Sequence, residues 1–147
     1  MKLSERLADS RLSISFEVFP PKTDTTFANV LAATERIAAL QPSFVSVTYG
    51  AGGRGSRYTL EIARQLHQTG QAEILAHLTC TGTDETSLKH YLNALRDAGI
   101  ENVMALRGDL PEDGGKPEIF PHAADLSLTC WERRGWADER GGEGAGK

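Results

Sequence analysis

The chain has 147 residues, a formal net charge of −4 and two cysteines, and its length is sufficient for one domain with its own core. The basic residues are scattered, the N-terminus has no apolar signal core, and no run reaches the ~18 apolar residues of a membrane span, so we expect neither a nucleic-acid nor a membrane partner. Cys80 and Cys130 match no metal-binding spacing, which favours a reduced, cytoplasmic protein without a metal site.

Four short apolar runs recur along the chain, and each is followed by polar or turn residues. Their first residues lie about thirty positions apart, which is the length of one strand–helix repeat. Because buried parallel strands read as continuous apolar runs, we interpret the four segments as strands. The predicted strands are Ile14–Glu17, Phe44–Tyr49, Ile74–Thr79 and Val103–Asp109.

A polar lead-in with helical character over residues 1–12 precedes the first strand. That strand ends at Pro20–Pro21, because proline cannot continue a ladder of hydrogen bonds. A helix is then predicted to start at Thr23–Thr25 and to end at Gln41–Pro42. Its apolar residues recur at helical spacing and are Phe27, Val30, Leu31, Thr34, Ile37 and Ala38.

Two further helices are predicted between the remaining strands. The first of them is capped by Ser56 and ends near Gly70. The second is capped by Thr83 or Asp84 and stops at Ala98–Gly99, because glycine after the last helical residue is a typical helix end.

The fourth strand is followed by a loop rich in proline, glycine and charge, from Leu110 to Pro121. A fourth helix begins near His122 but shows no helical period beyond Leu126, where the composition changes. Five glycines in the last thirteen residues argue against packed structure. We therefore divide the chain into a domain over residues 1–126 and a tail over residues 127–147, which we interpret as disordered or frameshifted. An ordinary flexible tail is the alternative.

The alternation of strands and helices predicts the fold class α/β. Four strand–helix units are half of an eight-unit barrel, and a closed (β/α)₈ TIM barrel needs ~250 residues. We therefore expect a partial barrel made of the first four units. In such a half barrel the outer edges of the first and fourth strands are unpaired.

Four side chains with acid–base or hydrogen-bonding groups lie at or near the carboxyl ends of the predicted strands. They are Glu17, Tyr49, His77 and Asp109. Open α/β folds place their chemistry at these strand ends, so parallel neighbouring strands would bring the four side chains to one rim. A rim with two carboxylates and a histidine is a hypothesis for an active site.

Glu17 lies between Phe16 and Val18. A carboxyl group among apolar neighbours loses solvation, so we expect its pKa to rise, which suits a general acid at neutral pH. The alternative is a surface glutamate at a strand end. His77 is likewise either a site residue or a hydrogen-bonded histidine of the core.

Asp109 follows Arg107 and Gly108. Glycine lets the backbone approach a ligand closely, and the arginine is suited to an anion such as phosphate; the alternative is a charged turn with a local Arg–Asp pair. Tyr49 either stacks on a planar ligand or serves packing. The loop over residues 50–55 is neither a dinucleotide-binding nor a Walker sequence, so a flexible connection explains it equally well.

Five segments stand out when the chain is considered as a whole: Ser15–Lys22 (SFEVFPPK), Val45–Ala51 (VSVTYGA), His77–Cys80 (HLTC), Ala105–Pro111 (ALRGDLP) and Gly115–Glu118 (GKPE). In this order and at this spacing they resemble the N-terminal half of the methylenetetrahydrofolate reductase family. The resemblance runs from about residue 13 to residue 126. Each motif is modest, but the set is very specific.

The resemblance implies a (β/α)₈ flavoprotein that binds FAD at the carboxyl ends of its strands and uses NADH or NADPH as the reductant. It implies a folate substrate, 5,10-methylenetetrahydrofolate, which is reduced to 5-methyltetrahydrofolate for methionine biosynthesis, and a tendency to form homo-oligomers. By the family's pattern, Glu17 would be the general acid that opens the methylene bridge, and Asp109 would lie near the flavin and the folate. The residues implied to line the flavin or nicotinamide site are Thr48, Tyr49, Ala51, His77, Leu106, Arg107, Gly108, Asp109 and Phe120.

The chain also departs from the family's pattern. Phe120 stands where members often have a tyrosine, and the later half of the family's barrel, with further contacts to FAD and folate, has no counterpart here. Two other hypotheses therefore stay open. One is an inactive, truncated fragment of that enzyme, and the other is a different barrel enzyme that binds a phosphorylated substrate through Arg107 and the loop over residues 50–55.

Overall fold

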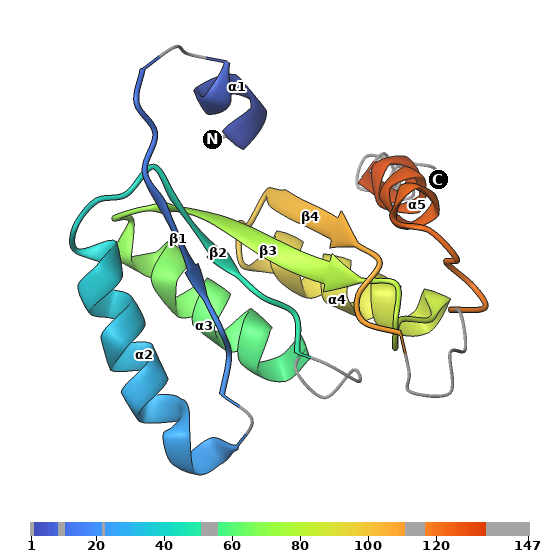
Figure 1. Ribbon diagram of the computed structural model, residues 1–147, viewed down its shortest axis with the longest axis horizontal. Helices are drawn as coiled ribbons and strands as arrows, with labels where there is room; N and C mark the ends of the chain where they lie inside the picture. Colours follow the sequence, from blue (N-terminus) through green and yellow to red (C-terminus); the bar gives the residue numbers. More distant parts are fainter. Residues whose placement is uncertain (1, 9–10, 22, 51–55, 111–116, 135–147) are drawn as a thin grey trace, which may run out of the picture.

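The computed structural model describes residues 2–8, 11–21, 23–50, 56–110 and 117–134 (Figure 1). Strands and helices alternate along the chain after a short N-terminal helix, as the spacing of the apolar runs predicted. The elements are α1 (Leu3–Leu7), β1 (Ser15–Val18), α2 (Asp24–Ala38), β2 (Phe44–Val47), α3 (Ser56–Thr69), β3 (Glu73–Thr79), α4 (Glu85–Asp97), β4 (Asn102–Leu106) and α5 (Ala123–Arg134).

The four strands form one sheet in the order β1-β2-β3-β4, and each neighbouring pair is parallel. This confirms the predicted arrangement, and it is the arrangement of the first four units of a (β/α)₈ barrel. Strands β1 and β4 each pair on one side only, so each presents one open edge among the described residues. Helix α1 lies near the N-terminal ends of the strands (Figure 1), where the backbone N–H of Leu3 donates to Asn102 Oδ1 over 2.9 Å.

The hydrophobic core lies between the sheet and the helices α2, α3 and α4, which line one face of it (Figure 1). Alternate residues of the central strands point to this face because successive side chains of a strand point to opposite sides. Val45, Val47, Ile74, Ala76 and Leu78 are all at most 1% exposed. The helices contribute further buried side chains, among them Ile62, Leu66, Leu88 and Leu95.

The ends of two helices follow the local signals of the sequence. Asp84 caps α4, accepting a hydrogen bond from the backbone N–H of Ser87 while the Ser87 hydroxyl accepts one from the backbone N–H of Asp84, which is a complete capping box. These bonds lower the pKa of Asp84. Gly99, with φ +76°, ends α4, and Gly70, with φ +64°, follows α3. The predicted cap of α3 at Ser56 involves a side chain outside the described residues.

Helix α5 corrects the end predicted for the fourth helix. It does not stop at Leu126 but continues through Arg134, so the boundary placed at residue 126 falls within a helix. Only a narrow stripe of α5 is covered: Leu126 is fully buried, whereas Cys130 and Arg133 are half-buried. A stripe with one large apolar residue gives too weak a period to be read from the sequence. The rest of the predicted tail, residues 135–147, lies outside the described residues.

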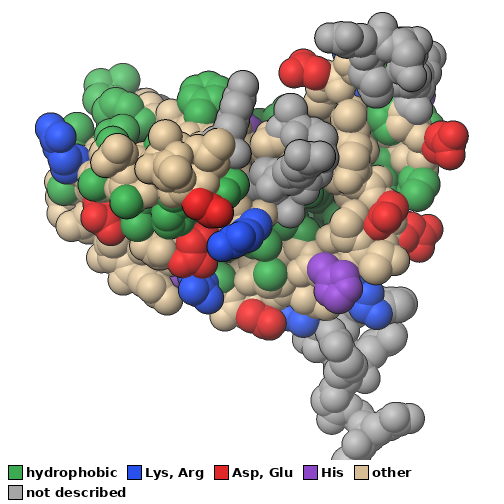
Figure 2. Space-filling view, turned by 90° about the horizontal axis from the view of Figure 1, so that it is seen from below, with side chains coloured by type: hydrophobic (Ala, Val, Ile, Leu, Met, Phe, Trp, Pro, Cys, Tyr) green, Lys and Arg blue, Asp and Glu red, His purple; other side chains and the backbone are tan. Residues whose placement is uncertain are grey.

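On the surface seen in Figure 2, acidic and basic side chains are interspersed and do not separate into regions of one sign. No helix in the described part of the chain has the length and hydropathy needed to cross a membrane. Several large apolar side chains are exposed, including Phe19 and Ile14 near the edge strand β1 and Met104 on β4.

Candidate functional site

The face of the sheet opposite α2, α3 and α4 carries the predicted chemistry. Its members are fixed by the strand register, which pairs Glu17 with Ser46, Ser46 with Leu75, and His77 with Met104. Registered partners in a parallel sheet point to the same side, so these side chains share one face. In a complete barrel this open face would be the interior.

Glu17 and His77 approach one another on this open face, although 59 residues of chain lie between them in the sequence. His77 Nε2 lies 3.9 Å from Glu17 Oε2, across the intervening strand β2. This contact confirms that the parallel strands bring the acid and the imidazole together. The predicted apolar surroundings of Glu17 are wrong, however: its side chain is 48% exposed, because β1 is an edge strand and the neighbouring Phe19 points into solvent.

His77 is buried, with 5% of its surface exposed, and its Nε2 atom has no hydrogen-bond partner among the described residues. Burial lowers the pKa of His77, and the nearby Glu17 carboxylate opposes part of that shift. The backbone of the same residue is held firmly, since the Tyr91 hydroxyl of α4 donates to its carbonyl oxygen over 2.9 Å. A neutral imidazole in a fixed position therefore stands beside an acid.

Gly108 follows β4 with φ +81°, in a conformation that favours glycine. A Cβ atom at this position would lie 3.0 Å from Thr79 Cβ and 3.3 Å from Thr81 Cβ, so the backbone here also requires the small residue. Thr81 continues the pairing beyond the strand ends, because its backbone N–H and its hydroxyl both donate to the carbonyl oxygen of Arg107. The end of β4 is thereby held tightly against the end of β3.

Arg107 and Asp109 are exposed on either side of Gly108. No ion pair joins these two residues, which are both described, so the alternative of a local Arg–Asp pair is wrong. Nor does a hydrogen bond or ion pair link Asp109 to Glu17 or His77. The structure thus brings Glu17 and His77 together and leaves Asp109 at the rim, one residue beyond the sharp turn at Gly108.

Two of the predicted site residues belong to the core on the helix side. The ring of Tyr49 packs edge-on against the ring of Tyr91, with centroids 5.2 Å apart, so its packing role is the one the structure shows. Phe120 is 4% exposed and belongs to the hydrophobic core together with Leu126. Their predicted contacts with a cofactor therefore have no support from the geometry.

The remaining predicted residues lie at strand ends. Thr48 follows β2, and its carbonyl oxygen accepts a hydrogen bond from the Thr59 hydroxyl over 2.8 Å. Leu106 ends β4 in register with Thr79, and its carbonyl accepts from the backbone N–H of Cys80. Ala51 lies outside the described residues.

The comparisons with known proteins agree with this arrangement. The family model for methylenetetrahydrofolate reductase matches residues 2–131. The chain belongs to the methylenetetrahydrofolate reductase family. The chain is 41% identical over 115 residues to methylenetetrahydrofolate reductase (NADH) 1 from Zea mays, and 37% identical over 126 residues to 5,10-methylenetetrahydrofolate reductase from Pectobacterium carotovorum. The Escherichia coli relative of the same name is 36% identical over 126 residues.

These alignments cover 78–84% of this chain but only 19% of the maize reductase and 42% of each of the two bacterial reductases, so the chain spans less than half the length of these relatives. The family match continues to residue 131, beyond the predicted limit at residue 126 and into α5. The change of composition after Leu126 is therefore not the end of the match to methylenetetrahydrofolate reductase.

The residues on the open face fit a flavin of the kind that the resemblance to the reductase family implies. The buried, unpartnered Nε2 atom of His77 is suited to a hydrogen bond with a polar ligand atom, since an unpaired buried nitrogen is costly. Among the described residues, no group of three or more His, Cys, Asp or Glu side chains is arranged to hold a metal ion.

Sequence reasoning missed the residues that support this site. Thr79 and Thr81 surround Gly108, and Tyr91 holds the carbonyl of His77. The two threonines flank the buried Cys80 at the end of β3. This alternation of polar and apolar residues was the signal that both threonines lie on the same side of the chain. The sequence contains no signal for the hydrogen bond from Tyr91 to His77, because this bond depends on how α4 packs against β3.

Proposed function

We propose that this chain forms the half of a methylenetetrahydrofolate reductase barrel that holds FAD and supplies the acid for reduction of 5,10-methylenetetrahydrofolate. The observation that carries the proposal is the Glu17 carboxylate on the open face, 3.9 Å from the Nε2 atom of a buried imidazole, an atom that has no hydrogen-bond partner among the described residues. When bound, FAD would supply the redox chemistry, accepting electrons from NADH or NADPH and passing them to the folate carbon.

In this proposal Glu17 acts as the general acid. Opening the methylene bridge of the folate needs a proton on the departing nitrogen, which leaves an iminium carbon as the electrophile. The carboxyl group is half-exposed toward the open face, so its oxygen atoms are accessible to a ligand there. A carboxylic acid held next to a ligand nitrogen is a typical proton donor for this step.

His77 keeps positive charge away from this acid. Because burial lowers its pKa, the imidazole is neutral at pH 7. A neutral ring leaves the ligand side of the open face without a fixed positive charge at this position. In the proposal, the same ring offers Nε2 to a flavin or folate atom, and the exposed Asp109 at the rim binds polar groups of the folate.

The first test is flavin binding by the purified 147-residue chain. After incubation with FAD and removal of the free cofactor, we expect visible flavin absorbance to remain with the protein, and NADH or NADPH to bleach it. The matched variants are His77→Phe, which removes the ring nitrogen and should weaken FAD retention, and His90→Phe on the exposed side of α4, which should not. A folded, colourless protein that ignores added FAD would contradict the proposal and favour the inactive fragment.

The second test separates the acid from the cofactor. Glu17→Gln should retain NAD(P)H–menadione oxidoreduction, which needs no proton donor for the folate, and should lose the folate half-reaction. Glu35→Gln on the exposed side of α2 is the control and should retain both activities. Loss of both activities in Glu17→Gln without loss of folding would assign Glu17 to cofactor binding instead.

A further inference from the structure

Ser46 occupies the strand that separates the acid from the imidazole. It lies on β2 in register with Glu17 of β1, and on its other side it is in register with Leu75 of β3, two residues before His77. Register partners and residues two positions apart along a strand point to the same side, so Glu17, Ser46 and His77 share the open face. Because neighbouring strands lie about 4.8 Å apart, the acid and the ring meet only by reaching over β2 from opposite sides.

The side chain of Ser46 is small and has little room around it. It is 6% exposed, and its hydroxyl group is turned toward the backbone of β1, where it donates to the carbonyl oxygen of Phe16 over 3.5 Å. A larger side chain at this position would have to displace a neighbour, since added atoms in a well-packed site force the surrounding groups to shift.

Glu17 is the neighbour that such a shift displaces most easily. His77 is buried, and the hydrogen bond from the Tyr91 hydroxyl fixes its carbonyl oxygen, whereas the side chain of Glu17 is 48% exposed on an edge strand. The distance of 3.9 Å between Glu17 Oε2 and His77 Nε2 therefore depends on how much space the residue on β2 leaves to the carboxylate.

We propose that Ser46 is the positioning residue of this pair, whose small side chain leaves the room over β2 in which the Glu17 carboxylate reaches the His77 ring. The size of the side chain is the property that matters, and the hydroxyl group is not. The inference rests on the proposed function, in which Glu17 delivers a proton to the folate, because the position of the acid is important only if the acid is used.

The test is a set of substitutions that separates the size of the side chain from its hydroxyl group. Threonine and valine have nearly the same shape and are both well accepted in strands, but only threonine keeps the hydroxyl. Because the Glu17 carboxylate raises the pKa of His77, separation of the pair lowers that pKa. Titration of the imidazole by nuclear magnetic resonance should give the native pKa in Ser46→Ala and a lower pKa in both Ser46→Thr and Ser46→Val.

Two results of this series would overturn the proposal. A lower pKa of His77 in Ser46→Ala together with the native pKa in Ser46→Thr would assign the role to the hydroxyl group. An unchanged titration in all three variants would mean that the residue on β2 does not control the contact. Urea unfolding verifies that each variant is folded, and Ser46→Thr decides the question if Ser46→Val does not fold.

The Glu17→Gln background shows whether the effect passes through the acid. In this background Ser46→Val should lower the pKa of His77 no further, because the carboxylate that it displaces is already absent. A further decrease of the same size would mean that the added methyl group acts on His77 by burial alone, and it would contradict the proposal.

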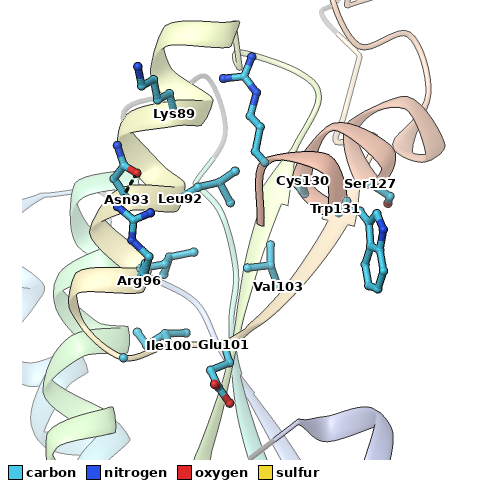
Figure 3. A pocket seen from close by; sticks show the side chains of 14 residues that line it. Lys89, Leu92, Asn93, Arg96, Ile100, Glu101, Val103, Ser127, Cys130 and Trp131 are labelled. Atoms are coloured by element: carbon cyan, nitrogen blue, oxygen red, sulfur yellow. Dashed lines mark hydrogen bonds between the residues drawn. The ribbon is translucent and has the colours of Figure 1, made fainter. Parts of the chain in front are cut away.

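Two matched enlargements serve as controls. Ser15→Val changes an exposed residue of the open face, two positions before Glu17 on β1. Val103→Ile enlarges a residue on the opposite face of the sheet, where Val103 of β4 borders a hollow of about 480 Å³ between α4 and α5 that has room for the added atom (Figure 3). Both variants should leave the titration of His77 unchanged. A shift in either control equal to that in Ser46→Val would show that the effect is not specific to Ser46.

The consequence for folate reduction is measured separately. Relative to NAD(P)H–menadione oxidoreduction, Ser46→Val should slow the folate half-reaction by about tenfold or more, because a displaced acid loses its geometry. An unchanged ratio of the two rates in a variant with a lowered pKa of His77 would overturn the positioning role. Absence of folate reduction in the native chain would contradict the proposed function instead, and the titrations would still decide whether Ser46 controls the contact.

Discussion

The two faces of the sheet are built from alternate residues of the same strands, yet they differ in nearly every physical property. Toward the helices, Val45, Val47 and Leu78 are completely buried among other apolar side chains. Toward the open side, Glu17 is half-exposed and His77 is buried with an unpartnered nitrogen. One residue step along a strand thus separates the side chains that stabilise the fold from those that are suited to chemistry.

The difference between the two faces explains how the protein can tolerate destabilising groups on the open face. An unpaired buried nitrogen and an acid beside it reduce stability, and the dense core on the other face offsets that loss. We therefore expect substitutions on the helix side to change the free energy of unfolding. Substitutions on the open side should mainly change ligand binding and pH dependence.

The largest effect is expected from truncation in the core. Leu78→Ala should lower the free energy of unfolding by about 2–5 kcal/mol, because it leaves a cavity where 0% of the side chain was exposed. Met104→Ala, on the open face and 40% exposed, should cost less than about 1 kcal/mol. Urea unfolding followed by circular dichroism measures both. Similar losses would show that the open face contributes to stability as much as the core.

The second prediction concerns the turn at Gly108. Gly108→Ala should cost about 2–4 kcal/mol, because the positive φ is unfavourable for alanine and the new Cβ would lie 3.0 Å from Thr79. Gly70→Ala is the matched control: its φ is also positive, but nothing lies within 4 Å of the added atom, so it should cost about 1–2 kcal/mol. The same urea titration compares them. Equal costs would mean that Thr79 and Thr81 yield readily.

The third prediction is a loss of stability in acid that depends on His77. Burial lowers the pKa of this histidine, so below the unfolded value of about 6.5 the unfolded chain binds more protons than the folded chain. The contribution is therefore fully present above about pH 6.5 and is lost as the pH falls through the folded pKa. Urea unfolding at several pH values should show this decrease.

His77→Gln tests the assignment, since it should remove this part of the pH dependence. His90→Gln, at an exposed position of α4, should keep it. A wild-type profile that is flat from pH 7 to pH 5 would contradict the neutral, buried state of His77.

The smallest effect is expected from Glu17→Gln. Because the side chain is 48% exposed, the free energy of unfolding should change by no more than about 0.5 kcal/mol. The substitution should nevertheless lower the pKa of His77 further, since the Glu17 carboxylate raises it in the native protein. A titration of the imidazole resonances by nuclear magnetic resonance measures this shift, and an unchanged titration would mean that the two side chains are not coupled.

Local sequence signals predicted much of this fold correctly. The apolar runs marked all four strands, and the cap at Asp84 and the stop at Gly99 marked the ends of α4. Such signals act within one turn of helix or one strand, so they do not depend on the rest of the molecule. The prediction for α5 was wrong because the chain after Leu126 has little apolar periodicity of its own. Local signals therefore did not indicate that the helix continues to Arg134, where it packs against β4.

The amino-acid sequence by itself determined the alternation of strands and helices, the family, and the acid and the histidine that belong near the strand ends. Only the tertiary structure decided which side chains meet. The register of β1, β2 and β3 brings Glu17 to His77 and turns Tyr49 toward Tyr91, away from the open face. The physical reason is that a strand alternates its side chains between two faces, so the position of a residue near a strand end does not say which face it serves until the strands are paired.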